Sequence, residues 1–357
     1  MIIPIFPALL WASSLLGSGV LSKTLEVPTS TATALGLPTS AFGTTIEGVG
    51  VDQIGNVYAV GYQSLANDTT AAASYGILSR AAGGASTTSD SRVFVAPKGP
   101  TGAPLLAGSR FISAGNTILL TDAVNHRVLA FDTRAKSFGI YCEDKIMIQP
   151  NDLAISVLRD NLIFLSGMNY TADSTAGISG ELWTCDRGKA IRFSPWVLAA
   201  ANIHRTNGIE VSPDGLSLYV SSSQNVNGSV ISNRIFRFAL DPVSGHILDR
   251  VPTLFYDFAE SPSIDIDGMR TDVDGNLYVT RNGDAQIAKL SSNGKLLLMI
   301  NIPNMGLGPR SLELGGPDGT TLYCVGLCKP PLDHRGCAAS LNVNVPGHAF
   351  DSMNHSD

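Results

Sequence analysis

Charged residues are scarce in this chain of 357 residues, and no segment of it is rich in lysine or arginine. Asp, Glu, Lys and Arg make up 15% of the sequence, and the formal net charge is −6. A nucleic-acid-binding protein normally carries a basic surface, so this charge balance excludes that class of partner. Helical proteins need more charged surface than this. The low charge, together with 36 Gly and 19 Pro, favours short strands joined by tight turns.

Several catalytic and metal-binding motifs are missing as well. The chain contains neither a G-x-S-x-G nucleophile elbow nor an H-E-x-x-H zinc motif, and its six histidines are scattered. No C-x-x-C pair or Cys/His spacing supports a zinc site. An EF-hand beginning at Asp272 is excluded, because its sixth and twelfth positions are Leu277 and Gly283 instead of Gly and Glu.

The first 22 residues contain no charged side chain, and the segment ends in small residues. It is too short and too often interrupted by proline to span a membrane, so we expect residues 1–22 to be a secretory signal peptide. Four Asn-x-Ser/Thr glycosylation triplets agree with secretion. They begin at Asn67, Asn169, Asn227 and Asn354. The sequence therefore predicts a secreted, extracellular glycoprotein without a membrane partner.

Five cysteines in an oxidising compartment allow two disulfides at most and leave one cysteine over. The pairing does not follow from the sequence, and Cys142 with Cys185 is the preferred pair. Cys337 lies in the last segment, residues 329–357, which has no periodicity. We expect this segment to be an irregular C-terminal tail.

A turn followed by an alternating strand recurs six times along the chain. The six segments are "QIGNVYAVG" (53–61), "SAGNTILLTD" (113–122), "LRDNLIFLSG" (158–167), "PDGLSLYVSS" (213–222), "VDGNLYVTRN" (273–282) and "PDGTTLYCVG" (317–326). Their turns use Gly, Asp and Asn, which tolerate positive φ, and their strands have a half-buried pattern. The period predicts an all-β, six-bladed β-propeller over residues 23–328, with about four strands per blade. Two packed sandwiches are the competing architecture, and a closed ring without free sheet edges predicts a monomer.

Polar side chains recur at one position in four of the six repeats. Counting back eight residues from each turn glycine, or nine in the third repeat, gives Glu47, Asn151, Asn207 and Asp267, with Ala107 and Ser311 in the other two. The innermost strand of each blade lines the central channel, so one offset in every repeat lies at one height. Two carboxylates and two amide oxygens suit Ca²⁺, Mg²⁺ or Mn²⁺. The alternative is that these residues only solvate the channel mouth.

The local motifs resemble those of a known family. "TIEGVGVDQIGNVYAV", "QPNDLAIS", "TNGIEVSPDGLSLYV" and "IDGMRTDVDGNLYVT" are together similar to the senescence marker protein 30/gluconolactonase (SMP-30, regucalcin-like) family of six-bladed propellers, over roughly residues 45–328. The resemblance implies that Glu47, Asn151, Asn207 and Asp267 bind one divalent cation, calcium first, with Mg, Mn or Zn as alternatives. It also implies a metal-dependent hydrolase that opens a small lactone or ester, with Asp267 as the general base.

The substrate-binding residues are less well defined by the sequence. The substrate-recognising arginine that the family implies has four candidates, Arg110, Arg205, Arg270 and Arg281. We expect His204, Arg205, Asn169 and Arg281 to contact the substrate. Two other functions stay open, because fold and metal do not determine the reaction. One is a strictosidine-synthase-like propeller enzyme of secondary metabolism, and the other is a non-catalytic binding propeller stabilised by its ion.

Overall fold

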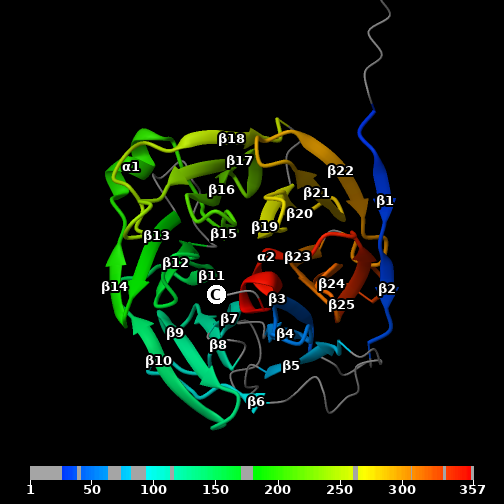
Figure 1. Cartoon of the computed structure of the whole chain (residues 1–357), viewed down its shortest axis with the longest axis horizontal. Helices are drawn as coiled ribbons and strands as arrows, with labels where there is room; N and C mark the ends of the chain where they lie inside the picture. The colour runs from blue at the N-terminus through cyan, green and yellow to red at the C-terminus, as the bar shows by residue number, and fades with distance from the viewer. Residues whose placement is uncertain are drawn as a thin grey trace, which may run out of the picture.

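Six mainly antiparallel sheets surround a central axis in the computed structural model of the chain, which confirms the six-bladed propeller (Figure 1). The structure describes residues 26–37, 42–62, 74–81, 94–112, 116–169, 180–259, 264–306, 308–332 and 335–354. The expected signal peptide therefore lies outside the described residues. No helix in the described part of the chain is long and apolar enough to cross a bilayer.

The first three blades use the strands in chain order. Blade 1 contains β3 (Thr45–Val51), β4 (Val57–Tyr62), β5 (Ser74–Ser79) and β6 (Phe94–Val95). Blade 2 contains β7 (Leu106–Ile112), β8 (Thr117–Asp122), β9 (Arg127–Asp132) and β10 (Ser137–Glu143). Blade 3 contains β11 (Pro150–Ile155), β12 (Leu162–Met168), β13 (Gly180–Asp186) and β14 (Lys189–Arg192), and the short helix α1 (Pro195–Ala200) follows it.

Blades 4 and 5 continue this arrangement, and blade 6 contains strands from both ends of the chain. Blade 4 contains β15 (Ile209–Val211), β16 (Ser217–Val226), β17 (Ser229–Ala239) and β18 (Thr253–Asp257). Blade 5 contains β19 (Asp265–Thr271), β20 (Leu277–Asn282), β21 (Gln286–Leu290) and β22 (Leu296–Asn301). Blade 6 contains β23 (Gly308–Gly315), β24 (Thr321–Leu327) and β25 (Gly336–Asn342), with β2 (Thr33–Leu35) outermost.

The N-terminal strands hold the ring closed through hydrogen bonds to the last two blades. β2 pairs antiparallel with β25, and β1 (Thr29–Thr31) pairs parallel with β22. Both strands lie along the outer edge of blades 5 and 6 in Figure 1. The edges of two blades are thereby covered by a segment from the other end of the chain, which removes free edges that another chain might pair with.

The C-terminal segment is ordered, which corrects the expected irregular tail. β25 is the third strand of blade 6, and Cys328 and Cys337 form a disulfide at its beginning. The helix α2 (His348–Asn354) then lies over the centre of the ring (Figure 1). The segment lacks sequence periodicity because β25 contains small and polar residues, and because α2 has no buried residue. The propeller therefore extends beyond residue 328.

Apolar side chains fill the spaces between neighbouring blades. One cluster joins blades 3 and 4, where Phe164 packs with Phe236 and Phe238. Another joins blades 2 and 3, where the predicted disulfide between Cys142 and Cys185 is present and connects β10 to β13. The fifth cysteine, Cys324, is buried and free. The alternating strand pattern in the sequence thus corresponds to blade faces that pack against each other.

Candidate functional site

The four predicted ligands sit at irregularities in the innermost strands. The pairing of β3 with β4 shifts by one residue at Glu47, and β11 with β12 shifts across Asn151. The same shift occurs at Asp267 between β19 and β20, and Asn207 directly precedes the paired part of β15. A β-bulge turns a side chain away from the regular alternation. These repeated bulges direct one side chain per blade towards the centre of the ring.

Glycines after the bulged residues allow the inner strands to approach each other closely. A Cβ atom at Gly208 would overlap the carbonyl oxygen of Asp267 on the next blade, and one at Gly48 would overlap that of Ala107. Only glycine has no side chain to clash there. In the "EG", "NG" and "DG" pairs of the sequence, the first residue is a predicted ligand, and the glycine is required for the close packing of the inner strands.

Hydroxyl groups on the second strands satisfy the backbone N–H groups that the bulges leave without a strand partner. The N–H of Asp267 donates to Thr280 Oγ1 at 3.2 Å, and that of Asn207 donates to Ser221 Oγ at 3.2 Å. Thr121 and Ser166 have the same role in blades 2 and 3. Buried N–H groups need such partners. These hydroxyl groups were not among the residues predicted from the sequence, although a Ser or Thr stands late in four of the six repeated strands.

All four predicted ligands line one cavity of about 260 Å³. The lining residues are Glu47, Asn151, Met168, Arg205, Asn207, Asp265, Asp267, Asn282 and Arg310. Asn282 Nδ2 donates to Asp267 Oδ2 at 3.2 Å, and Asp265 accepts a hydrogen bond from the Ser223 hydroxyl. Five of the six blades thus contribute to a single, mostly polar, hollow.

The environment of the cavity disfavours the charged form of its acidic side chains. Burial, followed by the Glu47 carboxylate, raises the pKa of Asp267 to about 8, although Arg310 lowers it in part. Burial also raises the pKa of Glu47 and of Asp265. Two carboxylates in one buried site repel each other unless a cation or a proton neutralises them. The site is therefore suited to holding additional positive charge.

The donor set fits a hard divalent cation. Asn207 Oδ1 is buried and has no hydrogen-bond donor among the described residues, so it is an acceptor without a partner. A buried carbonyl oxygen in this state costs free energy unless a cation or water satisfies it. The described residues contain no group of three or more His, Cys, Asp or Glu placed to hold a metal, so any ion here needs the amide oxygens as well.

Arg310 occupies the sixth position of the ring, where the repeat offset predicted Ser311. The bulge between β23 and β24 falls between Pro309 and Ser311, one residue earlier than the offset predicts, so Arg310 is the bulged residue. Its Nη1 lies 3.6 Å from Asp267 Oδ2, and its Nε lies 3.8 Å from Glu47 Oε1. A cationic side chain thus faces both predicted acidic ligands.

The predicted substrate-binding residues separate into two groups. Arg205 lines the cavity, whereas His204, Asn169 and Arg281 are not among the residues that line it. The Arg281 guanidinium stacks over the ring of Phe258 at 4.4 Å. Burial lowers the pKa of His204. Of the glycosylation triplets, Asn227 and Asn354 are exposed, Asn169 is half-buried, and Asn67 lies outside the described residues.

A layer of buried charges lies deeper in the channel than the ring. It consists of Arg110, Asp152, Glu210, Arg270 and Glu313. Arg270 Nε donates to Glu313 Oε2 at 2.9 Å, and Arg110 Nη1 donates to Asp152 Oδ1 at 3.2 Å. Two of the four arginines that the sequence offered for substrate recognition are thus held in ion pairs away from the cavity.

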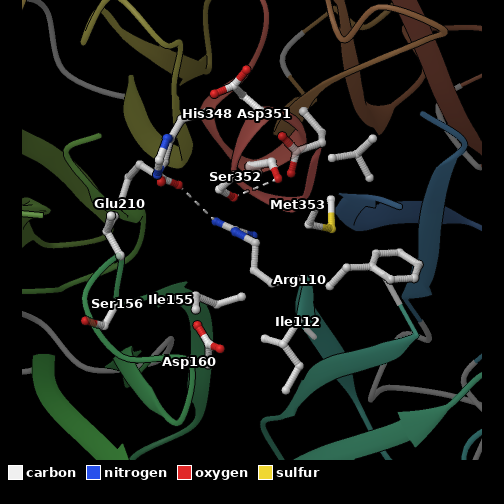
Figure 2. A pocket seen from close by; sticks show the side chains of 15 residues that line it. Arg110, Ile112, Ile155, Ser156, Asp160, Glu210, His348, Asp351, Ser352 and Met353 are labelled. Atoms are coloured by element: carbon white, nitrogen blue, oxygen red, sulfur yellow. Dashed lines mark hydrogen bonds and ion pairs between the residues drawn. The ribbon is translucent and has the colours of Figure 1, made fainter. Parts of the chain in front are cut away.

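A second cavity of about 380 Å³ lies on the α2 side of this charged layer (Figure 2). Arg110 and Glu210, 3.5 Å apart, form part of its wall, and His348 and Met353 of α2 face it. It contains none of the four predicted ligands. The predicted metal-binding residues therefore line the smaller of these two cavities.

The fold and the ring define a six-bladed propeller with an oxygen-lined cavity at its centre. The family model described as "SMP-30/Gluconolactonase/LRE-like region" matches residues 86–326, which is more than half of the 357 residues. The chain belongs to this family. The match includes Asn151, Asn207 and Asp267 but begins after Glu47, whose place in the ring rests on the structure. A search of curated proteins gave no match.

Solved structures of similar fold agree with this assignment. A regucalcin from Agrobacterium tumefaciens, described as a calcium-binding protein, has a TM-score of 0.64 at 16% identity, over 90% of this chain and 97% of that one. A luciferin-regenerating enzyme has a TM-score of 0.63 at 17% identity, over 88% and 97%. A gluconolactonase from Xanthomonas campestris has a TM-score of 0.56 at 15% identity, over 85% and 87%. At these identities the similarity establishes the fold alone.

Proposed function

We propose that this protein is a secreted, divalent-metal-dependent lactonase that opens a small cyclic ester with water. The observation that carries the proposal is the convergence of Glu47, Asn151, Asn207 and Asp267, from four blades, on one cavity. The family and the gluconolactonase among the similar structures support the reaction class. The regucalcin described as calcium-binding makes Ca²⁺ the first choice of ion.

Glu47, Asn151, Asn207 and Asp267 would hold the ion. When bound, a divalent ion supplies Lewis-acid chemistry, polarising an ester carbonyl and stabilising the negative charge that develops on its oxygen. The side chains around it orient the reactants. Asn282 fixes Asp267 through its hydrogen bond to Oδ2, so the carboxylate keeps one orientation towards the cavity.

Asp267 is our candidate general base. Its carboxylate is buried at the cavity wall, where it can accept a proton from the attacking water and return it to the ring oxygen that leaves. Arg205, on the same wall, would position the substrate.

The two disulfides fit an oxidising compartment and so support the proposed secretion. The reaction is tested by assaying purified protein with gluconolactone and a homoserine lactone, with added calcium and with chelator. We expect calcium-dependent ring opening of at least one lactone and its loss in Asp267→Ala. Hydrolysis that is equally fast in chelator, or unchanged in Asp267→Ala, would contradict the proposal.

A further inference from the structure

The side chain of Arg205 is a buried cation for which the described part of the chain shows no hydrogen bond to an oxygen atom. It is 8% exposed and lines the cavity from the segment that precedes β15. Its Nη2 contacts the Met168 sulfur at 3.3 Å, and its Nε has no hydrogen-bond partner among the described residues. A thioether is a weak acceptor. Asp265 interacts with Arg205 electrostatically, without a hydrogen bond between them. Such a guanidinium points to an acceptor that a ligand supplies.

Arg310 provides a second guanidinium to the same cavity. Its side chain is 33% exposed, and its distances of 3.6 and 3.8 Å to Asp267 and Glu47 exceed normal hydrogen-bond lengths. If a divalent ion takes over these two carboxylates, as the proposed function requires, they no longer need Arg310 as a counter-charge. The guanidinium belongs to the cavity wall, where a ligand in the cavity can contact it.

The charge balance of the cavity favours an anionic ligand once the ion is present. Its charged side chains are three carboxylates, on Glu47, Asp265 and Asp267, and two guanidiniums, on Arg205 and Arg310. Their formal sum is −1, and a divalent ion changes it to +1. Arginine is the side chain best shaped to bind a carboxylate through paired N–H groups.

We propose that the substrate is an acidic lactone, a cyclic ester that carries a free carboxylate, and that Arg205 and Arg310 bind this carboxylate. The inference rests on the proposed function for the ester ring and the ion. It adds the charge of the substrate and the two residues that select it. Neutral lactones of the same ring lack the group that these guanidiniums bind and are expected to be weaker ligands.

Binding of a non-hydrolysable pair tests the inference without any need for turnover. Tetrahydrofuran-2-carboxylate has the ring and the carboxylate without an ester, and tetrahydrofuran-2-carboxamide is its uncharged match. Isothermal titration calorimetry with and without calcium would compare the wild type with Arg205→Gln, Arg205→Lys and Arg310→Gln. Arg237→Gln, which removes a charge from an exposed position on β17, is the matched control.

We expect the wild type with calcium to bind the acid at least about 10-fold more tightly than the amide, the size of a charge-assisted hydrogen bond. This preference should disappear in Arg205→Gln and Arg310→Gln, persist in Arg237→Gln and survive in part in Arg205→Lys. Equal binding of acid and amide, binding of neither, or an unchanged preference in both glutamine variants would overturn the inference. If Arg205→Gln does not fold, the acid preference of Arg205→Lys and of Arg310→Gln tests the inference.

The two proposals fail in different ways. A wild type that binds no calcium and opens no lactone, yet still prefers the acid through these arginines, contradicts the proposed function and leaves the anion site in place. A wild type that opens neutral lactones with calcium but ignores the carboxylate contradicts only the acidic substrate.

Discussion

The guanidinium of Arg310 lies 3.6 Å from the carboxylate of Asp267, on the neighbouring blade of the ring. The same side chain lies 3.8 Å from Glu47, so one internal cation faces both acidic members of the proposed ion site. An ion that enters the site therefore meets a positive charge that already interacts with its ligands. Arg310 is expected to weaken ion binding while it prepares the cavity for an anionic substrate.

Replacing Arg310 with Gln should therefore tighten calcium binding. Removing a like charge at this distance is worth about 10-fold in affinity, after allowance for the screening of a partly exposed side chain. Calorimetric titration of calcium into the wild type, Arg310→Gln and the exposed-site control Arg237→Gln would measure the change. Weaker binding in Arg310→Gln than in the control would show that Arg310 supports the ion instead of competing with it.

The close approach of the inner strands predicts a strict requirement for glycine beside the site. Gly208→Ala would place a Cβ against the Asp267 carbonyl oxygen, so we expect a loss of about 1–3 kcal/mol or more in the free energy of unfolding. Gly139→Ala on β10 is the control, since nothing lies within 4 Å of a Cβ there. Urea unfolding of both variants would compare them, and equal stabilities would contradict the proposed packing of the ring.

The disulfide between Cys142 and Cys185 should stabilise the propeller more than the one between Cys328 and Cys337. The first closes 43 residues and joins two blades, whereas the second closes 9 residues. Loop entropy predicts losses of about 4 and about 2.5 kcal/mol when each pair is replaced by alanine. Urea unfolding of the two double variants would show the order. A larger loss for the Cys328–Cys337 pair would mean that loop entropy does not govern their contributions.

Glu210 in the buried charged layer should make stability depend on pH. Burial raises its pKa from 4.5 to about 7, with Arg110 and Arg270 acting in the opposite direction. The folded state therefore holds this proton more tightly than the unfolded state, so the free energy of unfolding falls as pH rises between these two values. The full effect is about 3 kcal/mol at about 1.4 kcal/mol per pKa unit.

Glu210→Gln keeps an uncharged side chain at this position and should remove that part of the slope. Urea unfolding in chelator from pH 4.5 to 8 would compare it with the wild type and with Glu143→Gln, an exposed control on β10. If the free energy of unfolding of Glu210→Gln depends on pH as steeply as that of the wild type, a group other than Glu210 causes the pH dependence.

Much of the fold followed from the sequence because the same hairpin is repeated. Six turns with alternating strands predicted six blades. An offset of eight residues from the turn, or nine in the third repeat, identified Glu47, Asn151, Asn207 and Asp267, which line one cavity. The preferred disulfide between Cys142 and Cys185 is confirmed, although the repeats alone do not determine the pairing.

The sequence did not predict the features in which one part of the chain differs from the repeated pattern. Arg310 lines the cavity because the bulge in blade 6 begins one residue early, and a bulge position is not visible in strand periodicity. The ring closes through β2, whose three residues have no repeat signature. The α2 helix contains no buried residue, so no apolar stripe marks it in the sequence.

Calcium binding to purified wild-type protein and to Asp267→Asn, measured by isothermal titration calorimetry, tests the central claim most directly. Asp267→Asn keeps the shape of the side chain and removes one of the two acidic ligands. We predict one calcium site in the wild type and a loss of affinity of at least about 100-fold in the variant, since a hard divalent ion depends on ligand charge. A wild type that binds no calcium, or equal binding by both proteins, would mean that the ring is a polar channel and not an ion site.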